Sequence, residues 1–179
     1  RREVLVRVTG CHRHVRQPFE ITLFQAIAKG PAMEGLIHRA VELGCARIVP
    51  LLTERSVSRP DDASAKQARW ESVAVEAAKQ SGNPWCMSVA APVTPAAWLA
   101  APHGQDVLLI ASLEDDPVHP LAPLIRHQQE HGHSPRSLGV LIGPEGDFTP
   151  AEYSAFRSAG ARPISLGPHV LRVETAATA

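Results

Sequence analysis

The sequence predicts an α/β fold built on a mostly parallel sheet. Apolar runs at 47–52, 107–111 and 138–142 are typical of buried strands, and amphipathic helical patterns lie between some of them. A further strand is expected at 163–166. Strands that alternate with helices along a chain usually form a parallel sheet with helices on both faces.

Two of the expected helices have a recognisable beginning or end. Pro31 suits the first helical position, and Gly44 tolerates the positive φ that ends a helix. A later helix begins at Thr149-Pro150-Ala151-Glu152, a capping box with proline in the first turn, and ends at Gly160. Phe148 and Tyr153 are spaced to form a hydrophobic staple over its start. A further helix is expected over about 64–81.

The two least typical stretches are the N-terminus and residues 114–136. Alternating apolar residues in Glu3–Val8 predict a strand, followed by a basic loop. A strand with no partner before it suggests that residues 1–20 are the remnant of a preceding domain. Residues 114–136 are rich in Pro and His, so we expect them to be irregular and mobile.

Composition excludes several classes of protein. The chain has 179 residues, enough for one good core, and its 18 basic and 18 acidic residues balance. Net charge therefore does not indicate a nucleic-acid partner, although the first twenty residues are basic. Three cysteines without a CxxC pattern indicate no disulfide framework. The chain has no apolar run long enough to span a membrane and no signal-peptide core at its start, so a cytoplasmic location is expected.

One segment matches a zinc-protease motif but has the wrong surroundings. His127-Gln128-Gln129-Glu130-His131 fits the pattern H-x-x-E-H, whose histidines share a helix face. Its flanks are polar and proline-rich, and no acidic ligand on a second helix is evident. We interpret it as an exposed helix end and expect no metal. Cys11-His12-Arg13-His14 also lacks a second ligand cluster.

Two glycine-containing loops carry the strongest functional indication. Leu141–Gly146 and Leu166–Ala176 both begin in apolar runs, and neither contains a Rossmann or Walker phosphate-binding motif. A simple strand-to-helix turn explains one loop of this kind, but it does not explain why there are two. It also gives no reason for the charged residues Arg172 and Glu174 within an otherwise apolar C-terminal segment. Ligands of open α/β sheets bind beyond the carboxyl ends of strands, so a bound cofactor is the better interpretation.

Motifs along the chain resemble those of the RsmE family of ribosomal RNA uridine-N3 methyltransferases, in the SPOUT class of trefoil-knotted enzymes. The matching residues, from about Leu23 to the C-terminus, are Lys29, Gly30, Met33, Glu34, Glu42-Leu43-Gly44, Glu54-Arg55-Ser56, Trp70, Glu76-Ala77, Gln80, Leu141–Gly146 and Leu166–Ala176. Three features depart from the family. Asp147 stands where a glycine is usual, Asn83 replaces an arginine, and both ends look short, with an N-terminal PUA-like β-barrel reduced to residues 1–20.

The resemblance implies a SPOUT domain over 21–179, a C-terminal trefoil knot and S-adenosylmethionine as cofactor. It implies a cofactor pocket made by three loops, with these residues: Ala111, Leu141, Ile142, Gly143, Pro144, Gly146, Leu166, Gly167, Val170 and Leu171. Arg172 is the first candidate to hold the uracil or its phosphate. Glu174 is a candidate for proton handling, or alternatively a carboxylate that satisfies helix-start N–H groups. The RNA-binding candidates are Arg13, Arg16, Lys29 and Arg55.

The resemblance therefore predicts a homodimeric enzyme that methylates N3 of a uridine in 16S ribosomal RNA of the small subunit. Two alternatives stay open. One is a ribose 2′-O-methyltransferase of the same fold, which needs fewer base contacts. The other is an inactive RNA- or cofactor-binding module, suggested by Asp147 and the short N-terminus.

Overall fold

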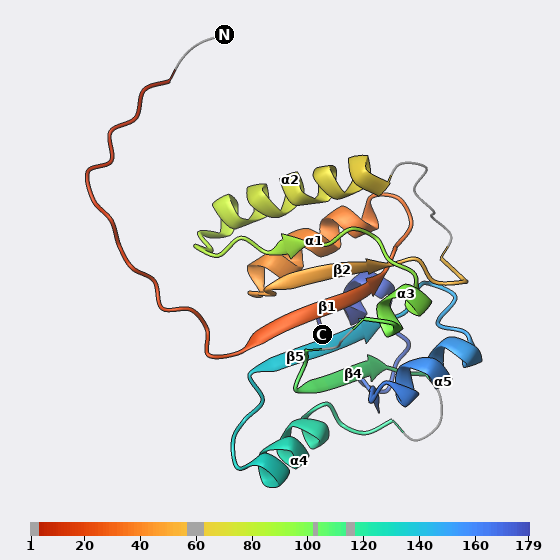
Figure 1. Cartoon of the computed structure of the whole chain (residues 1–179). Helices are drawn as coiled ribbons and strands as arrows, with labels where there is room; N and C mark the ends of the chain where they lie inside the picture. Colours follow the sequence, from red (N-terminus) through yellow and green to blue (C-terminus); the bar gives the residue numbers. More distant parts are fainter. Residues whose placement is uncertain (1–3, 57–62, 102–103, 114–116) are drawn as a thin grey trace.

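A six-stranded parallel sheet forms the centre of the structure, a computed structural model that describes residues 4–56, 63–101, 104–113 and 117–179 (Figure 1). Its strands are β1 (Glu20–Ala26), β2 (Arg47–Leu51), β3 (Ser88–Val89), β4 (Val107–Ala111), β5 (Ser137–Ile142) and β6 (Arg162–Ile164). Their spatial order is β3-β2-β1-β5-β4-β6, and every neighbouring pair is parallel. The expected α/β class and parallel sheet are confirmed.

The sequence analysis missed β1, which lies at the centre of the sheet. It pairs with β2 on one side and with β5 on the other, with Leu23 opposite Ile48 and Val140. Its last four residues are all buried, because helices cover both faces. Thr22 and the fully buried Gln25 interrupt the apolar residues of this strand, so it lacks the continuous apolar run that marked the other buried strands.

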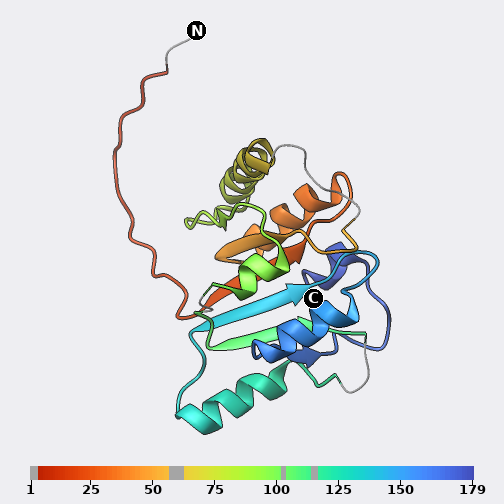
Figure 2. The same ribbon diagram turned by 45° about the vertical axis from the view of Figure 1, so that its right-hand side comes forward.

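Helices divide between the two faces of the sheet. On one face, α1 (Ala32–Glu42), α2 (Ala63–Ser81) and the short α6 (Val173–Ala176) pack around Leu23 and Ile142. On the other face, α3 (Pro95–Leu99) and α5 (Pro150–Ser158) pack against Phe24 and Leu141 (Figure 2). Successive strand residues thus contact opposite helical layers, as a parallel sheet requires.

The beginning of α5 has the expected capping box. Thr149 Oγ1 accepts a hydrogen bond from the Glu152 backbone N–H at 3.3 Å, and Glu152 Oε2 accepts one from the Thr149 N–H at 2.9 Å. The rings of Phe148 and Tyr153 meet edge-on at 5.5 Å, as the staple predicted. Glu152 Oε1 also accepts from the Glu54 N–H at 2.9 Å, which joins this helix to the loop after β2.

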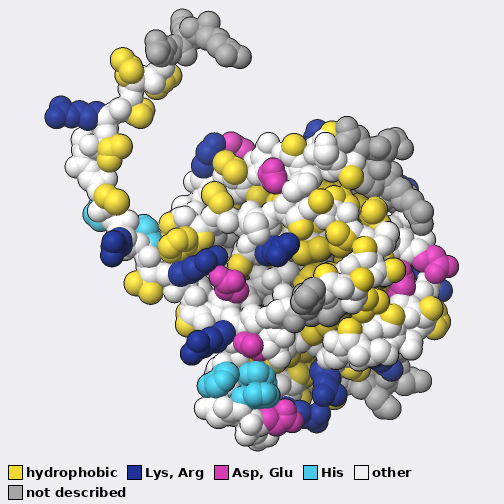
Figure 3. All heavy atoms as spheres, viewed as in Figure 1, with side chains coloured by type: hydrophobic (Ala, Val, Ile, Leu, Met, Phe, Trp, Pro, Cys, Tyr) yellow, Lys and Arg dark blue, Asp and Glu magenta, His cyan; other side chains and the backbone are white. Residues whose placement is uncertain are grey.

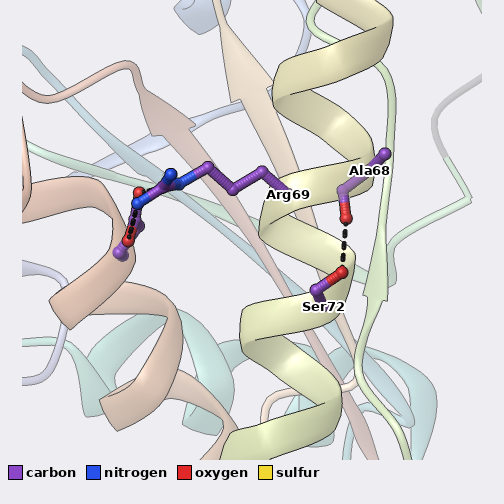
Figure 4. Close-up of polar contacts among 4 residues, drawn as sticks. Ala68, Arg69 and Ser72 are labelled. Atoms are coloured by element: carbon purple, nitrogen blue, oxygen red, sulfur yellow. Dashed lines mark hydrogen bonds and ion pairs between the residues drawn. The ribbon is translucent and has the colours of Figure 1, made fainter. Parts of the chain in front are cut away.

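An ion pair joins α2 to α1 on the outer surface. Arg69 donates two hydrogen bonds to the Glu34 carboxylate, one of them from Nη2 to Oε2 at 3.0 Å (Figure 4). These bonds lower the pKa of Glu34 and raise that of Arg69. One turn along α2, the Ser72 hydroxyl donates to the Ala68 carbonyl at 2.9 Å. The motif glutamate at position 34 therefore connects two helices.

Two expectations about local structure are wrong. Residues 4–8 are not a strand: they lie in an exposed segment that extends away from the sheet, whereas Glu3 falls outside the described residues (Figure 1). Alternation favours β-structure, but a strand also needs a pairing partner. Within 114–136, where 114–116 are not described, residues Leu121–His131 form α4, which ends at Gly132 in a left-handed conformation. Leu124 packs this helix against Val107 and Leu109.

The domain boundary at residue 20 and the trefoil knot stay predictions. In the described ranges, no helix is both long and apolar enough to cross a membrane.

Candidate functional site

A cavity of about 430 Å³ opens where three parallel strands end. It lies beyond the carboxyl ends of β4, β5 and β6, and a volume of this size suits a small-molecule ligand. β4 lies between β5 and β6 in the sheet, so the loops that follow these strands meet at one edge. The cavity is lined by residues 111–113, 142–145, 147, 165–167, 169–174 and 176.

Most of the predicted site residues line this cavity. They are Ala111, Ile142, Gly143, Pro144, Leu166, Gly167, Val170, Leu171, Arg172 and Glu174. Leu141 and Gly146 do not. Leu141 is fully buried on the opposite face of the sheet, against Phe24 and Leu108, because neighbouring strand residues point to opposite faces. Gly146 lies on the outer side of its loop, next to Arg55.

Several lining residues were missed by the sequence analysis. They are Ser112, Leu113, Glu145, Asp147, Ser165, His169, Val173 and Ala176. Glu145, His169, Val173 and Ala176 lie within the two glycine-containing loops, and the other four lie one or two positions from a predicted residue. Asp147 was noticed only because its residue type is unusual at that position.

Hydrogen bonds from the loops after β1 and β2 hold the loop over residues 143–147 from outside. Arg55 donates from Nη1 to the carbonyl oxygens of Gly146, at 2.8 Å, and Phe148, at 3.4 Å. The Lys29 backbone N–H donates to Glu145 Oε1 at 3.1 Å. The guanidinium of Arg55, a candidate for RNA binding, thus holds a loop of the cavity, and its contact with RNA stays a prediction.

Asp147 has an unusual backbone conformation and a fixed side chain. Its φ of 62° is the only positive value for a non-glycine residue in the described part of the chain. Its Oδ1 accepts hydrogen bonds from the Phe148 N–H and the Tyr153 hydroxyl, each at 2.8 Å. Burial, followed by this bond to Asp147, raises the pKa of Tyr153 far above its ordinary value. The phenol therefore stays protonated, and keeps this hydrogen bond to Asp147, well above neutral pH.

Arg172 and Glu174 flank a buried anchor at the other side of the cavity. Val173 packs into the core with α1 and α2, and this fixes the backbone on both sides of it. Arg172 is exposed, and its guanidinium has no hydrogen-bond or ion-pair partner within the described ranges. Glu174 lies in the first turn of α6, the position that its helix-start alternative requires, and it also lines the cavity.

The four predicted RNA-binding cations fall into two groups at opposite ends of β1. Arg13 and Arg16 precede the strand, in the exposed N-terminal segment, where Arg16 pairs with Glu20 at 3.1 Å. Lys29 and Arg55 lie past the carboxyl ends of β1 and β2, next to the cavity. Figure 3 shows cationic side chains both along the N-terminal segment and on the body of the protein.

The H-x-x-E-H motif lies on α4, away from the cavity. The rings of His127 and His131 stack at 4.2 Å, and His131 Nδ1 bonds to the His127 carbonyl oxygen at 3.0 Å. No group of three or more side chains suited to hold a metal occurs among the residues that the structure describes. Figure 3 shows one group of histidine side chains at the lower left of the body, and others on the N-terminal segment.

Comparison with known proteins decides the family. The profile of the RNA methyltransferase domain matches residues 15–179. The chain belongs to the RNA methyltransferase domain family. The resemblance drawn from the motifs is thereby confirmed at the level of the family.

Relatives of this RNA methyltransferase domain include proteins of known name. The chain is 34% identical to ribosomal RNA small subunit methyltransferase E of Synechocystis sp., over 90% of the chain and 51% of that protein. It is 28% identical to the protein of the same name from Bacillus subtilis, over 89% of the chain and 62% of that protein. The chain thus spans only about half to two thirds of these relatives.

Solved structures of the family have the same fold. A putative methyltransferase from Legionella pneumophila, in complex with the bound cofactor SAM, has a TM-score of 0.79 and 32% identity over 90% of this chain and 63% of that one. Ribosomal RNA small subunit methyltransferase E from Neisseria gonorrhoeae, bound to S-adenosylmethionine, has a TM-score of 0.76 and 28% identity, again over 90% and 63%.

Proposed function

We propose that this chain is the catalytic domain of an S-adenosylmethionine-dependent methyltransferase that acts on N3 of a uridine in 16S ribosomal RNA. The observation that carries the proposal is the cavity at the ends of β4, β5 and β6, lined by ten of the residues that the family motifs singled out. The named relatives and the SAM-bound neighbours support the same activity.

The residues around the cavity fit a cofactor of this kind. Gly143 lets the loop at the cavity fold tightly, since a Cβ there would lie 3.0 Å from Asp147 Oδ1 and 3.3 Å from the Phe148 nitrogen. Ile142, Leu166 and Leu171 supply apolar walls, and loop backbone groups supply donors and acceptors. The described lining residues contain no basic phosphate-binding loop, which a nucleotide triphosphate would require and this cofactor does not.

In this proposal, the protein contributes mainly position. When bound, the cofactor supplies a methyl group already activated on a sulfonium, so holding the two reactants in line accounts for much of the rate. Arg172, unpaired in the described chain and fixed by Val173, would hold the uracil base or its phosphate and stabilise negative charge as N3 loses its proton. Glu174 would accept that proton or satisfy the start of α6.

The proposal extends to partners that the family resemblance implies. RNA would approach along Lys29 and the exposed N-terminal segment with Arg13 and Arg16. Residues 1–20 would belong to a PUA-like domain. The active form would be a homodimer in the cytoplasm. The C-terminal segment that lines the cavity would be part of a trefoil knot.

Calorimetry followed by methylation assays tests the proposal. We expect the chain to bind S-adenosylmethionine with micromolar affinity. With tritiated cofactor, it should label small ribosomal subunits from a strain that lacks the corresponding enzyme. Digestion of the labelled RNA to nucleosides should then give 3-methyluridine.

Other results assign one of the alternatives. A 2′-O-methylated nucleoside would identify a ribose methyltransferase of the same fold. Cofactor binding without labelling of either naked RNA or intact subunits would identify an inactive module, and absence of cofactor binding would contradict the proposal altogether.

A further inference from the structure

Asp147 places a negatively charged side chain on the wall of the cavity. It lies in the loop after β5, close to Ala111 and Ser112 at the end of β4, and it lines the cavity. Its left-handed conformation costs free energy, even though Asp tolerates it better than most residues. A strained residue at a cavity wall is a reason to look for a function.

Two hydrogen bonds fix the direction of this carboxylate. The Phe148 N–H and the Tyr153 hydroxyl both donate to Oδ1 at 2.8 Å. Tyr153 itself is held firmly, because its ring is almost completely buried and packs edge-on against Phe148. The Tyr153 hydroxyl also lies 3.4 Å from the Ala111 carbonyl oxygen, at the end of β4. The charge therefore has a defined place between two strand ends.

Gly143 is complementary to this arrangement. A Cβ at position 143 would approach Asp147 Oδ1 to 3.0 Å, a tight contact that would require the carboxylate to shift, so glycine fits the observed place of the Asp147 side chain. The loop thus accommodates the Asp147 side chain on its inner side, toward Gly143, and does not turn it out to solvent.

Among the described residues, the lining of the cavity carries more negative than positive charge. These residues include three carboxylates, from Glu145, Asp147 and Glu174, and one guanidinium, from Arg172. Glu145 Oε1 is partly engaged by the Lys29 N–H, and it lies on the exposed side of its loop. A wall with this balance favours a cation over a neutral ligand of the same shape.

We propose that Asp147 is a specificity-determining residue, which makes the cavity favour the cationic methyl donor over its neutral demethylated product. The inference rests on the proposed function. Methyl transfer turns a sulfonium into a neutral thioether, so donor and product differ by one positive charge and one methyl group. A fixed carboxylate discriminates on that charge and thereby weakens inhibition by the product.

Calorimetry on the full chain tests this with three probes: S-adenosylmethionine, S-adenosylhomocysteine and sinefungin. Sinefungin has an amine in place of the sulfonium, so it keeps the positive charge without a transferable methyl group. In Asp147→Asn, we expect the preference for S-adenosylmethionine over S-adenosylhomocysteine to fall about five- to tenfold, the size of one partly screened charge interaction. Sinefungin should lose affinity in parallel with S-adenosylmethionine.

Three further variants serve as controls. Glu76→Gln removes one carboxylate from the outside of α2, where it pairs with Lys79, and should leave the preference unchanged. Asp147→Gly relieves the left-handed strain and should fold at least as stably as the parent while losing the same preference. Tyr153→Phe keeps the carboxylate but frees its direction, so its preference should lie between those of the parent and Asp147→Asn.

Two outcomes overturn the inference. The first is an unchanged preference in both Asp147 variants. The second is an equal loss of affinity for all three probes, which would assign Asp147 to the shape of the loop and not to charge. If the parent chain binds none of the probes, the proposed function itself fails, and the inference falls with it.

Discussion

Arg55 donates a hydrogen bond from Nη1 to the Gly146 carbonyl oxygen at 2.8 Å, across 91 residues of sequence. The bond joins the loop after β2 to the loop that forms one wall of the cavity. The side chain of Arg55 also packs on the glycine, with its Cβ 3.5 Å and its Cδ 3.6 Å from the place that a Gly146 Cβ would occupy. A surface cation that looked like an RNA contact is therefore also a positioning residue for the candidate site.

Replacing Arg55 with alanine should weaken cofactor binding. The loop would lose a charge-assisted hydrogen bond worth roughly 1 kcal/mol, which corresponds to about a fivefold rise in the Kd for S-adenosylmethionine by calorimetry. Lys29→Ala is the matched control, because only the backbone of Lys29 contacts this loop in the described structure. If Arg55→Ala left the Kd for S-adenosylmethionine unchanged but weakened RNA binding, Arg55 would act only as an RNA contact.

Gly139→Ala should destabilise the fold. A Cβ at this position of β5 would lie 2.7 Å from Leu108 Cδ1 and 2.8 Å from Phe24 Cε2, both in the core between the sheet and α5. Overpacking of this kind costs about 1–3 kcal/mol, measured as a lower urea midpoint. Gly35→Ala in α1 is the control: only Arg39 Nη2, at 3.9 Å, comes near, so it should gain about 0.5–1 kcal/mol. Equal midpoints for the two variants would contradict this account of the packing.

The single tyrosine of the chain, Tyr153, should not ionise near pH 10 while the protein is folded. Burial and the hydrogen bond to Asp147 raise its pKa, so the neutral phenol is favoured in the folded state. This contribution to stability is complete below the pKa of the unfolded chain, about 10, and is lost as pH rises above it.

Absorbance of tyrosinate measures this directly, because no other tyrosine contributes. We expect no tyrosinate signal in the folded protein between pH 9 and 11, and a transition near pH 10 in urea. A folded-state transition near pH 10, with secondary structure intact, would contradict both the burial of Tyr153 and its hydrogen bond to Asp147.

Arg172→Ala should keep cofactor binding and lose turnover. The Arg172 side chain is exposed at the cavity and has no partner in the described structure, so its removal leaves the Val173 anchor intact. We expect the Kd for S-adenosylmethionine to change less than twofold, and the rate of uridine methylation to fall at least a hundredfold. Arg172→Lys distinguishes a planar, two-donor contact from simple charge, since lysine retains only the charge. Normal turnover in the alanine variant would remove Arg172 from the mechanism.

Local sequence patterns predicted those helices and strands that have a recognisable capping residue or an apolar run. The helix expected over 64–81 is Ala63–Ser81, and the strand at 107–111 has the predicted bounds. The capping box at Thr149 formed as expected, because its contacts span only three residues. The sequence analysis missed β1 and wrongly expected a strand at 3–8. Both errors arose because a local apolar pattern does not show which strands are available for pairing.

The sequence by itself determined the α/β class and the two glycine-containing loops, because these are set by periodicity and turn residues. The family motifs carried the resemblance that implied a third loop at the cavity. Only the tertiary structure decided which motif residues reach the cavity. Leu141 and Ile142 are neighbours on β5, yet the pleat sends them to opposite faces of the sheet. The tertiary structure also places Arg55 next to Gly146, and Asp147 next to Gly143 and Tyr153. Such contacts depend on the positions of loops that are distant in sequence, and no local pattern records them.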